Sequence, residues 1–274
     1  MLRARGRGAA PWGRRWSGRV LWALLALGSI LLSLRGGQAR APGKLVPVAE
    51  VLDGDTIRVR LNGKVETVRY LYVDTPELHH PQRGEEEFGR EAWEANRSLL
   101  ASGEVGLSFD RQRRDKYGRL LATPMVRSHD GGWVWVTEEL ARRGLCLAME
   151  VPPNDSGTWR IRAAVAEAKA NRRGLWGPSA SRGRGYTEGQ LKSVAGKLLG
   201  RWVRVSLVVR SVSVSRSGGV TIRGDRNFLF VQSYRGVWDF DSIRPGDRLV
   251  IWGCLSRSPR GWHVRWVDPA QRME

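Results

Sequence analysis

Three short blocks of the sequence combine charged residues with turn-forming residues. They read Asp53-Gly-Asp55-Thr-Ile, Arg69-Tyr-Leu-Tyr-Val-Asp74-Thr-Pro-Glu77 and Asp115-Lys-Tyr-Gly-Arg119. Carboxylate oxygens are hard ligands that suit divalent cations, and the planar guanidinium of arginine makes paired bonds with phosphate. For Asp55 or Asp74 alone, turn formation and solvation would explain the presence of the acid. The blocks together favour a functional site.

A predicted hairpin brings the acids of the first two blocks to one end of a sheet. Alternating apolar and polar residues predict strands over 45–61 and 64–73, and Asn62-Gly63 between them tolerates the positive φ angles of a two-residue turn. Asp55 opens one arm of this hairpin and Asp74 closes the other. Both carboxylates are therefore expected at the same end of the sheet.

The ideal register of this hairpin does not by itself form a site. It pairs Asp55 with Tyr70 and places Arg69 on the opposite face from Asp55. We therefore expect barrel curvature or a bulge to turn the two side chains toward one pocket.

These three blocks resemble the hallmarks of the staphylococcal nuclease (thermonuclease) family, in which DGDT, R-x4-D-T-P-E and D-K-Y-G-R motifs follow in this order. The resemblance covers residues 45–177, about half of the chain. It implies a mainly β fold with helices, in which a five-stranded OB-fold barrel carries three helices.

The resemblance also implies a metal ion and a general base. The carboxylates of Asp55 and Asp74 and the main-chain carbonyl of Thr75 would bind one calcium ion, with waters in the remaining positions. Glu77 would activate the attacking water in phosphodiester hydrolysis, a role typically worth about 10²–10⁴ in rate.

Basic and aromatic residues complete the set that the resemblance implies. Arg69 and Arg119 would stabilise the transition state through paired bonds to phosphate. Lys116 would contact phosphate, and Tyr117 would pack on the nucleotide. This chain departs from the family near Met149, where members often have a nucleotide-contacting tyrosine, so base packing is expected to be weaker.

Spacing and caps predict the remaining elements of this first domain. Helices are expected over 85–100, with its first turn acidic, over 137–143 and over 158–173. Strands are expected over 105–110 and 120–126. Pro124 lacks a backbone donor, which predicts an edge or a bulge there.

A second, basic domain is predicted to follow a flexible linker over 178–185. Residues 186–274 contain short alternating strands and a short helix capped by Thr187, and they resemble small OB-fold domains that bind nucleic acids. The blocks that carry this resemblance begin at Lys197, Arg244 and Trp262. We therefore expect a second small OB-like β-barrel.

The net charge of +19 is unevenly distributed. Residues 1–39 carry seven arginines and no acid, residues 44–177 are almost neutral, and residues 178–274 carry 17 basic and seven acidic residues. Such a field attracts polyanions, whether nucleic acid, anionic cell wall or membrane surface.

Five tryptophans of the second domain alternate with arginines, and this mixture allows two interpretations. The rings could stack on bases, or most of them could fill the barrel. The tryptophans are Trp202, Trp238, Trp252, Trp262 and Trp266, and the neighbouring arginines are Arg201, Arg204, Arg248 and Arg265.

The first 39 residues resemble an export signal. Arginines precede an apolar run over 20–34, which is shorter than the roughly 20 residues that span a bilayer, and Gly37 and Ala39 suit a signal peptidase. An uncleaved membrane anchor and a twin-arginine signal at Arg14-Arg15 remain alternatives. We expect a secreted protein, or one anchored through residues 20–34.

The leading hypothesis is an exported, calcium-dependent endonuclease that cleaves DNA and RNA with little base selectivity and leaves 3′-phosphate ends. It is expected to be a monomer without a protein partner. Two alternatives are a non-catalytic nucleic-acid-binding scaffold and an envelope-attached protein whose basic domain binds anionic polymers. The two cysteines, Cys146 and Cys254, are too few for a disulfide scaffold and lack the spacing of metal ligands. Cysteine-rich secreted proteins and zinc fingers are therefore excluded.

Overall fold

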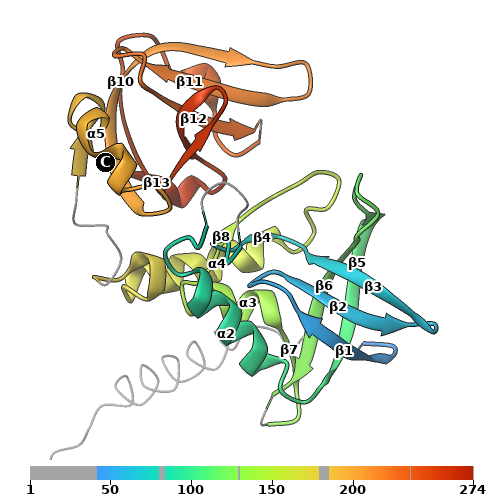
Figure 1. Cartoon of the computed structure of the whole chain (residues 1–274). Helices are drawn as coiled ribbons and strands as arrows, with labels where there is room; N and C mark the ends of the chain where they lie inside the picture. The colour runs from blue at the N-terminus through green and yellow to red at the C-terminus, as the bar shows by residue number, and fades with distance from the viewer. Residues whose placement is uncertain (1–41, 80–83, 129, 179–184, 235, 274) are drawn as a thin grey trace, which may run out of the picture. The chain divides into compact units, whose positions relative to one another are not determined.

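A computed structural model describes residues 42–79, 84–128, 130–178, 185–234 and 236–273. These residues belong to one compact unit (Figure 1). The predicted leader over 1–39 and most of the predicted linker lie outside the described residues. Among the helices that are described, none has the length and apolar character needed to cross a bilayer.

The first part of the chain folds into a closed five-stranded barrel, as the sequence predicts. Its strands are β1 (Leu45–Val51), β2 (Thr56–Leu61), β3 (Lys64–Tyr70), β5 (Glu104–Arg114) and β6 (Leu120–Arg127). Neighbouring strands pair antiparallel in the order β3-β2-β1-β5-β6, and parallel pairing of β3 with β6 closes the barrel. Three short strands accompany it: β7 (Trp133–Trp135) beside β6, and β4 (Val73–Asp74) paired with β8 (Leu147–Ala148).

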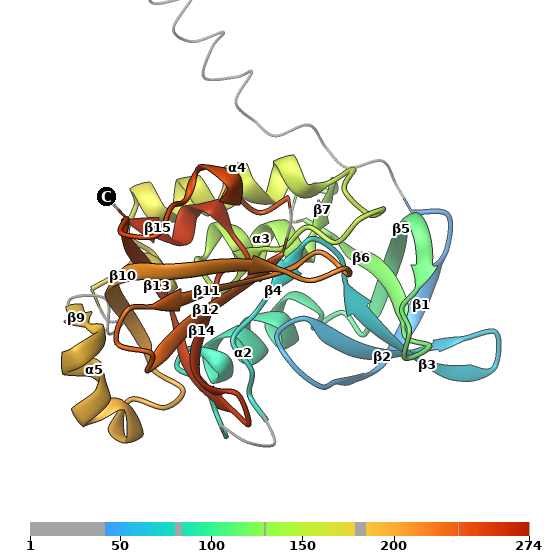
Figure 2. The same cartoon turned by 90° about the horizontal axis from the view of Figure 1, so that it is seen from above.

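A tight turn joins β2 and β3 into the predicted hairpin (Figure 2). Asn62 and Gly63 adopt φ angles of 51° and 77°, which asparagine and glycine tolerate better than other residues. Thr56 lies opposite Arg69, so the Tyr70 amide donates to the carbonyl of Asp55 at 2.9 Å. The local sequence therefore fixes the register that carries the first two blocks.

Three helices pack beside the first barrel, as expected. They are α2 (Gly89–Leu99), α3 (Val136–Arg142) and α4 (Thr158–Ala170), with α3 next to both of the others (Figure 1). Ala92 and Asn96 of α2 are buried, and Asn96 accepts a hydrogen bond from the hydroxyl of Tyr70 at 2.8 Å. This bond ties α2 to the end of β3.

The start of α2 corrects the prediction of a helix from residue 85. Phe88 takes a left-handed conformation with φ of 71°, and the helix begins at Gly89. Glu86 and Glu87 instead accept hydrogen bonds from the backbone amides of Glu77 and Trp202. Glu86 and Glu87 therefore bind other segments of the chain and do not form the first helical turn.

Pro124 does not mark a sheet edge or a bulge. Strand β6 has β5 on one side and both β3 and β7 on the other. Residues 120–122 pair with β3 and residues 125–127 pair with β7, so Pro124 falls between the two paired segments. The missing backbone donor is accommodated by this gap in pairing.

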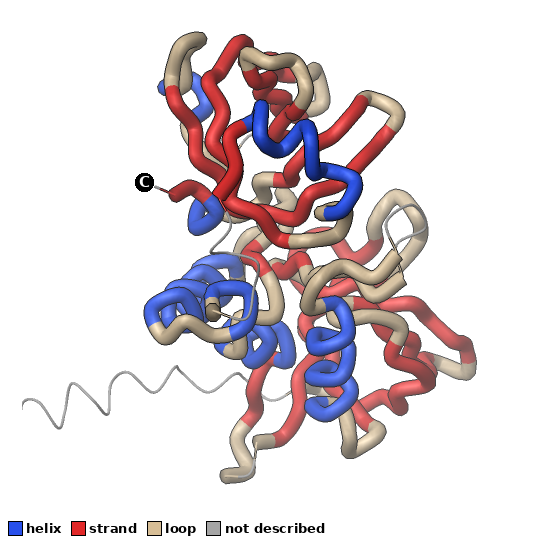
Figure 3. Tube along the Cα trace, turned by 60° about the vertical axis from the view of Figure 1, so that its left-hand side comes forward, coloured by secondary structure: helices blue, strands red, loops and turns tan. Residues whose placement is uncertain are grey.

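The second part of the chain is also a β-barrel, and strands make up most of both barrels (Figure 3). Its strands are β9 (Gly185–Thr187), β10 (Trp202–Val214), β11 (Gly219–Gly224), β12 (Leu229–Tyr234), β13 (Arg248–Ser258), β14 (Gly261–Arg265) and β15 (Arg272–Met273). Helix α5 (Glu188–Val194) starts at the predicted Thr187 cap, and Gln190 completes a capping box. Short 3-10 helices cover Gly174–Trp176, Ala195–Lys197, Phe240–Ser242 and Pro269–Gln271.

Three of the five tryptophans of the second barrel are buried. Trp202, Trp252 and Trp266 are buried, which removes them as stacking platforms, whereas Trp238 and Trp262 are partly exposed. The rings of Trp202 and Trp252 belong to the buried cluster that also contains the core of the first barrel. Burying a large apolar side chain contributes on the order of 1.5–3 kcal/mol, so these two rings help to join the barrels.

Candidate active site

Two predicted metal ligands converge on one arginine. Arg69 Nη1 forms an ion pair with Asp55 Oδ2, and Arg69 Nη2 lies 3.2 Å from Asp74 Oδ1. Asp55 and Asp74 are largely buried, with 9% and 13% of their side chains exposed. Burial raises the cost of separating these charges, so the three side chains act as one electrostatic unit.

The bend before β2 explains how Asp55 meets Arg69 in spite of the strand register. Asp55 precedes the first residue of β2. Its side chain therefore does not have to follow the alternation of side chains between the two faces of that strand. The amide of Thr75 donates to Asp55 Oδ2 at 3.0 Å, which holds the carboxylate toward β4. A Cβ atom on Gly54 would lie 2.7 Å from Thr75 Oγ1, so only glycine permits this close approach.

The donor set fits a hard divalent cation. Oxygens of Asp55 and Asp74 each contact one terminal nitrogen of the same guanidinium, so both reach a single positive centre. Thr75 Oγ1 is buried and has no hydrogen-bond partner among the described residues. In that same part of the chain, no cluster of three or more His, Cys, Asp or Glu side chains could hold an ion. Further oxygens would have to come from backbone carbonyls and water.

Glu77 is held beside this acidic site through its backbone. Its amide donates to Glu86 Oε2 at 3.0 Å, and its carbonyl accepts from the Glu86 amide at 2.9 Å. Burial, the hydrogen bond with Asp53 and the negative charge of Asp55 raise the pKa of Glu77 to about 8. A cation held by the neighbouring carboxylates would favour the ionised form that a general base requires.

The third block forms a tight turn that presents Arg119. Asp115 Oδ1 accepts from the amides of Tyr117 and Arg119 at 2.9 and 3.0 Å, and Gly118 takes a positive φ of 82°. Arg119 Nε lies 2.8 Å from Asp115 Oδ2. Burial opposes ionisation of Asp115, but the bonds from Arg119 and the turn amides lower its pKa. The guanidinium is thereby oriented while 35% of the Arg119 side chain stays exposed.

The predicted substrate-binding residues share one groove with the two arginines that are predicted to be catalytic. A cavity of about 340 Å³ is lined by residues that include Arg69, Lys116, Tyr117 and Arg119. Tyr117 is 72% exposed, and its ring lies 5.0 Å from Lys116 Nζ and 5.6 Å from the guanidinium carbon of Arg119. The groove therefore offers an aromatic face between two cations, which suits an anionic, planar ligand.

Arg69 links the two halves of the site. It lines this groove and also pairs with Asp55 and Asp74, whereas Asp55, Asp74, Thr75 and Glu77 are not among the residues that line the cavity. Met149, the predicted counterpart of the family's nucleotide-contacting tyrosine, does line it. The structure thus brings all the predicted residues into one neighbourhood as an acidic part and a basic part.

Sequence reasoning missed three contributors to this neighbourhood. Asp53 interacts with Glu77, Glu86 fixes the backbone of Glu77, and Arg265 Nη2 of the second barrel lies 3.0 Å from Asp74 Oδ2. The negative charge of Asp74 raises the pKa of Arg265 above its ordinary value. The first block contains Asp53, so its proximity to Asp55 was a usable signal. Nothing local in the sequence connects Arg265 with Asp74.

Comparison with known proteins gives a family match. Residues 67–178 match the model of the family described as staphylococcal nuclease homologue. Thermonuclease of Staphylococcus intermedius is 35% identical over 139 residues, which cover 49% of this chain and 77% of that protein. The chain belongs to the staphylococcal nuclease family. The family match contains every predicted site residue except Asp55, which lies just before it.

Two endonucleases of Bacillus subtilis are also similar to about half of the chain. Endonuclease YncB of Bacillus subtilis is 41% identical over 140 residues, covering 50% of this chain and 64% of that protein. The SPbeta prophage-derived endonuclease YokF of the same organism is 39% identical over 133 residues, covering 48% of this chain and 43% of that protein. The chain thus spans less than two thirds of both Bacillus relatives.

Proposed function

We propose that this protein is a calcium-dependent endonuclease that hydrolyses phosphodiester bonds in DNA and RNA. The single observation that supports this most is the convergence of Asp55 and Asp74 on Arg69, which also lines a groove with Arg119. The relatives named above as thermonuclease and endonucleases agree with it.

The proposed calcium site consists of the carboxylates of Asp55 and Asp74 and the carbonyl of Thr75. When bound, the cation would supply positive charge close to the phosphate that is cleaved. The carboxylates are held in place for this task, because Thr75 donates to Asp55 and β4 pairs with β8 beside Asp74.

The proposed catalytic residues are Glu77, Arg69 and Arg119. Glu77 removes the proton from the attacking water as general base. Arg69 and Arg119 face the same groove and donate to the phosphoryl oxygens as negative charge grows on them. Asp115 keeps the Arg119 fork oriented through its contact with Nε, which leaves the terminal nitrogens available for phosphate.

Lys116 and Tyr117 are proposed to bind the substrate without selecting a base. Lys116 contacts phosphate, and the exposed ring of Tyr117 packs on a nucleotide. Phosphate and sugar contacts carry no direct sequence information, so we propose little base selectivity. By its family resemblance, cleavage of the P–O5′ bond would leave 3′-phosphate ends.

We also propose that the protein is exported and acts outside the cytoplasm, either released or anchored through residues 20–34. The arginine-rich start and the apolar run that follows support this proposal. Mass spectrometry of the mature N-terminus tests it. Loss of residues 1–39 supports release, an intact leader in the membrane fraction supports an anchor, and a cytoplasmic chain contradicts export.

The activity is tested by incubating residues 40–274 with plasmid and with single-stranded DNA, in calcium and then in chelator. We expect internal cleavage of both substrates in calcium and none in chelator. The absence of calcium-dependent cleavage from neutral to alkaline pH would contradict the proposal.

A further inference from the structure

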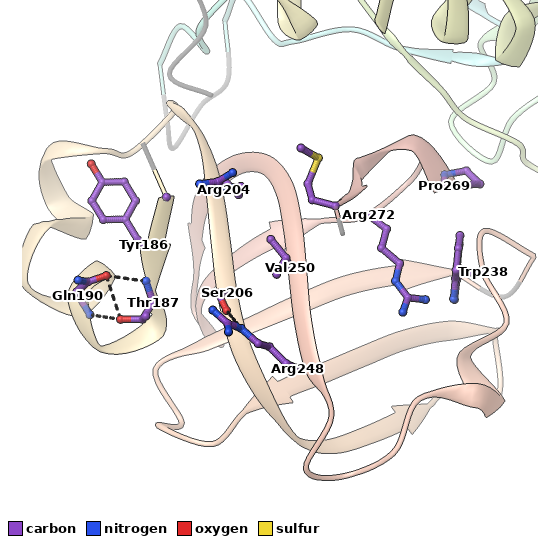
Figure 4. A pocket seen from close by; sticks show the side chains of 12 residues that line it. Tyr186, Thr187, Gln190, Arg204, Ser206, Trp238, Arg248, Val250, Pro269 and Arg272 are labelled. Carbon is purple, nitrogen blue, oxygen red and sulfur yellow. Dashed lines mark hydrogen bonds between the residues drawn. The ribbon is translucent and has the colours of Figure 1, made fainter. Parts of the chain in front are cut away.

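The second barrel carries a deep groove on the outer face of its β10–β13 sheet, away from the catalytic residues. Exposed and buried residues alternate along the first half of β10, so Arg204 and Ser206 point outward, and Arg248 and Val250 do so on β13. These four residues form the floor of a cavity of about 870 Å³ (Figure 4).

Two walls rise beside this floor. Tyr186 and Gln190, from β9 and α5, stand on one side, and Trp238 and Arg272 stand on the other (Figure 4). Thr187 is fixed in the first wall by the capping box with Gln190. We name this cavity the arginine groove, after Arg204, Arg248 and Arg272, which all line it.

Two of these three guanidiniums have a side-chain partner that positions them, and the third lies close to the backbone of β9. Arg248 Nε donates to Ser206 Oγ at 2.9 Å. The guanidinium carbon of Arg272 lies 4.7 Å from the ring centroid of Trp238, which favours a stacked cation. Arg204 lies so close to Gly185 that a Cβ atom there would be 2.9 Å from its Nη2. Arg248 and Arg272 are thus preorganised, which lowers the entropy cost of binding a ligand.

The described residues that line the arginine groove carry no negative charge. Its lining residues include no aspartate and no glutamate, and none of the three arginines forms an ion pair with any residue that the structure describes. In the first barrel, by contrast, Arg69, Arg114 and Arg119 all pair with carboxylates. Three uncompensated like charges around one cavity repel each other, and an anion between them would relieve that repulsion.

We propose that the arginine groove binds the sugar–phosphate backbone of single-stranded nucleic acid. Three planar guanidiniums offer paired bonds to successive phosphates, and basic grooves that follow the backbone are a general device for binding single strands. The recess between the two walls suits a flexible strand better than a rigid duplex or a flat lipid surface. The inference rests on the proposed function only in its choice of nucleic acid as the polyanion.

The test measures binding of the full chain to a fluorescein-labelled 20-nucleotide oligothymidylate by anisotropy, in chelator, over a range of salt concentrations. The groove variant carries Arg204→Gln, Arg248→Gln and Arg272→Gln. The control variant carries Arg216→Gln, Arg226→Gln and Arg260→Gln, which removes the same charge from exposed turns of the same barrel. Circular dichroism and melting confirm that both variants fold.

We expect the groove variant to bind about tenfold or more weakly and the control variant to lose less than about threefold. The slope of log affinity against log salt should fall by about two for the groove variant, because each single-strand phosphate contact contributes about 0.7. Equal losses in both variants, or no loss in the groove variant, would overturn the inference.

A second arm uses vesicles of 70% phosphatidylcholine and 30% phosphatidylglycerol. If the groove variant lost vesicle binding but kept oligonucleotide binding, the groove would serve a membrane surface and the inference would be wrong. All binding is measured in chelator and does not depend on cleavage. A protein that binds the oligonucleotide but does not cleave DNA in calcium would therefore contradict the proposed function and leave the groove assignment standing.

Discussion

The two barrels of this chain share a topology and differ in how they use charge. The first closes in the order β1-β2-β3-β6-β5 and the second in the order β10-β11-β12-β14-β13, and the five closing strands of each contain one parallel pair, β3 with β6 and β12 with β14. In the first barrel, acids and arginines meet in a largely buried cluster. In the second, arginines line a groove without acids. A shared strand order therefore does not determine chemistry, which depends on a few residues placed on it.

The largest expected effect comes from breaking the acid–arginine cluster of the first barrel. Arg69→Gln leaves Asp55 and Asp74 buried without their shared cation, and breaking such pairs typically costs about 3–5 kcal/mol. Chemical denaturation should show that loss. Calcium should restore part of it, because the ion would replace the missing positive charge. If the Arg69→Gln variant were as stable in chelator as the wild-type protein, Arg69 would not hold the cluster together.

Removing the Arg119 side chain from the groove of the first barrel should reduce the rate of cleavage without reducing the stability of the protein. We expect Arg119→Ala to lower the cleavage rate at least about 10²-fold, since it loses a donor to the phosphoryl oxygens. Arg113→Ala, an exposed arginine on the same barrel, serves as the control. A folded Arg119→Ala variant with an unchanged rate would contradict the role assigned to this residue.

Loosening the support of Glu77 should have a smaller effect. Glu86→Gln keeps the size of the side chain but weakens its bond to the Glu77 amide, and we expect cleavage to fall by about three- to tenfold in kcat with little change in KM. Glu85→Gln is the matched control, because Glu85 pairs only with the exposed Arg90 among the described residues. A change confined to KM would show that Glu86 does not act through Glu77.

The smallest expected effect tests the link between the barrels. Arg265→Gln removes a positive charge that lies 3.0 Å from Asp74 Oδ2. Because that charge repels a nearby cation, half-maximal activity should require about threefold less calcium. Calorimetric calcium binding gives a readout independent of activity, and Arg260→Gln is the control. A higher calcium requirement would mean that Arg265 instead holds Asp74 in place.

Local signals in the sequence predicted the features that depend on local chemistry. Asn62-Gly63 indicated the hairpin through its tolerance of positive φ, and Thr187 indicated the cap of α5. The three charged blocks indicated Arg69, Asp74 and Arg119, because a metal and a phosphate site needs those groups together. The family comparison shows the family, and the roles of these residues stay predictions.

Features that depend on contacts between distant segments could not be predicted in this way. The glutamates at 85–87 have the composition of a helical first turn, but Glu87 instead accepts from the amide of Trp202 at 2.9 Å. Trp202 and Trp252 suggested base stacking and lie instead in the shared core. Their positions depend on how the barrels pack, and no periodicity or motif in the sequence predicts that packing.

One pair of measurements tests most directly whether the first barrel carries catalysis and the second barrel carries nucleic-acid binding. Single-turnover cleavage in calcium and binding in chelator are measured for Glu77→Gln and for the arginine-groove variant. We expect Glu77→Gln to cleave at least about 10²-fold more slowly with Kd within about threefold of the parent, and the groove variant to bind about tenfold more weakly. Undiminished calcium-dependent cleavage by a folded Glu77→Gln variant would contradict the assignment of catalysis to the first barrel's acidic site.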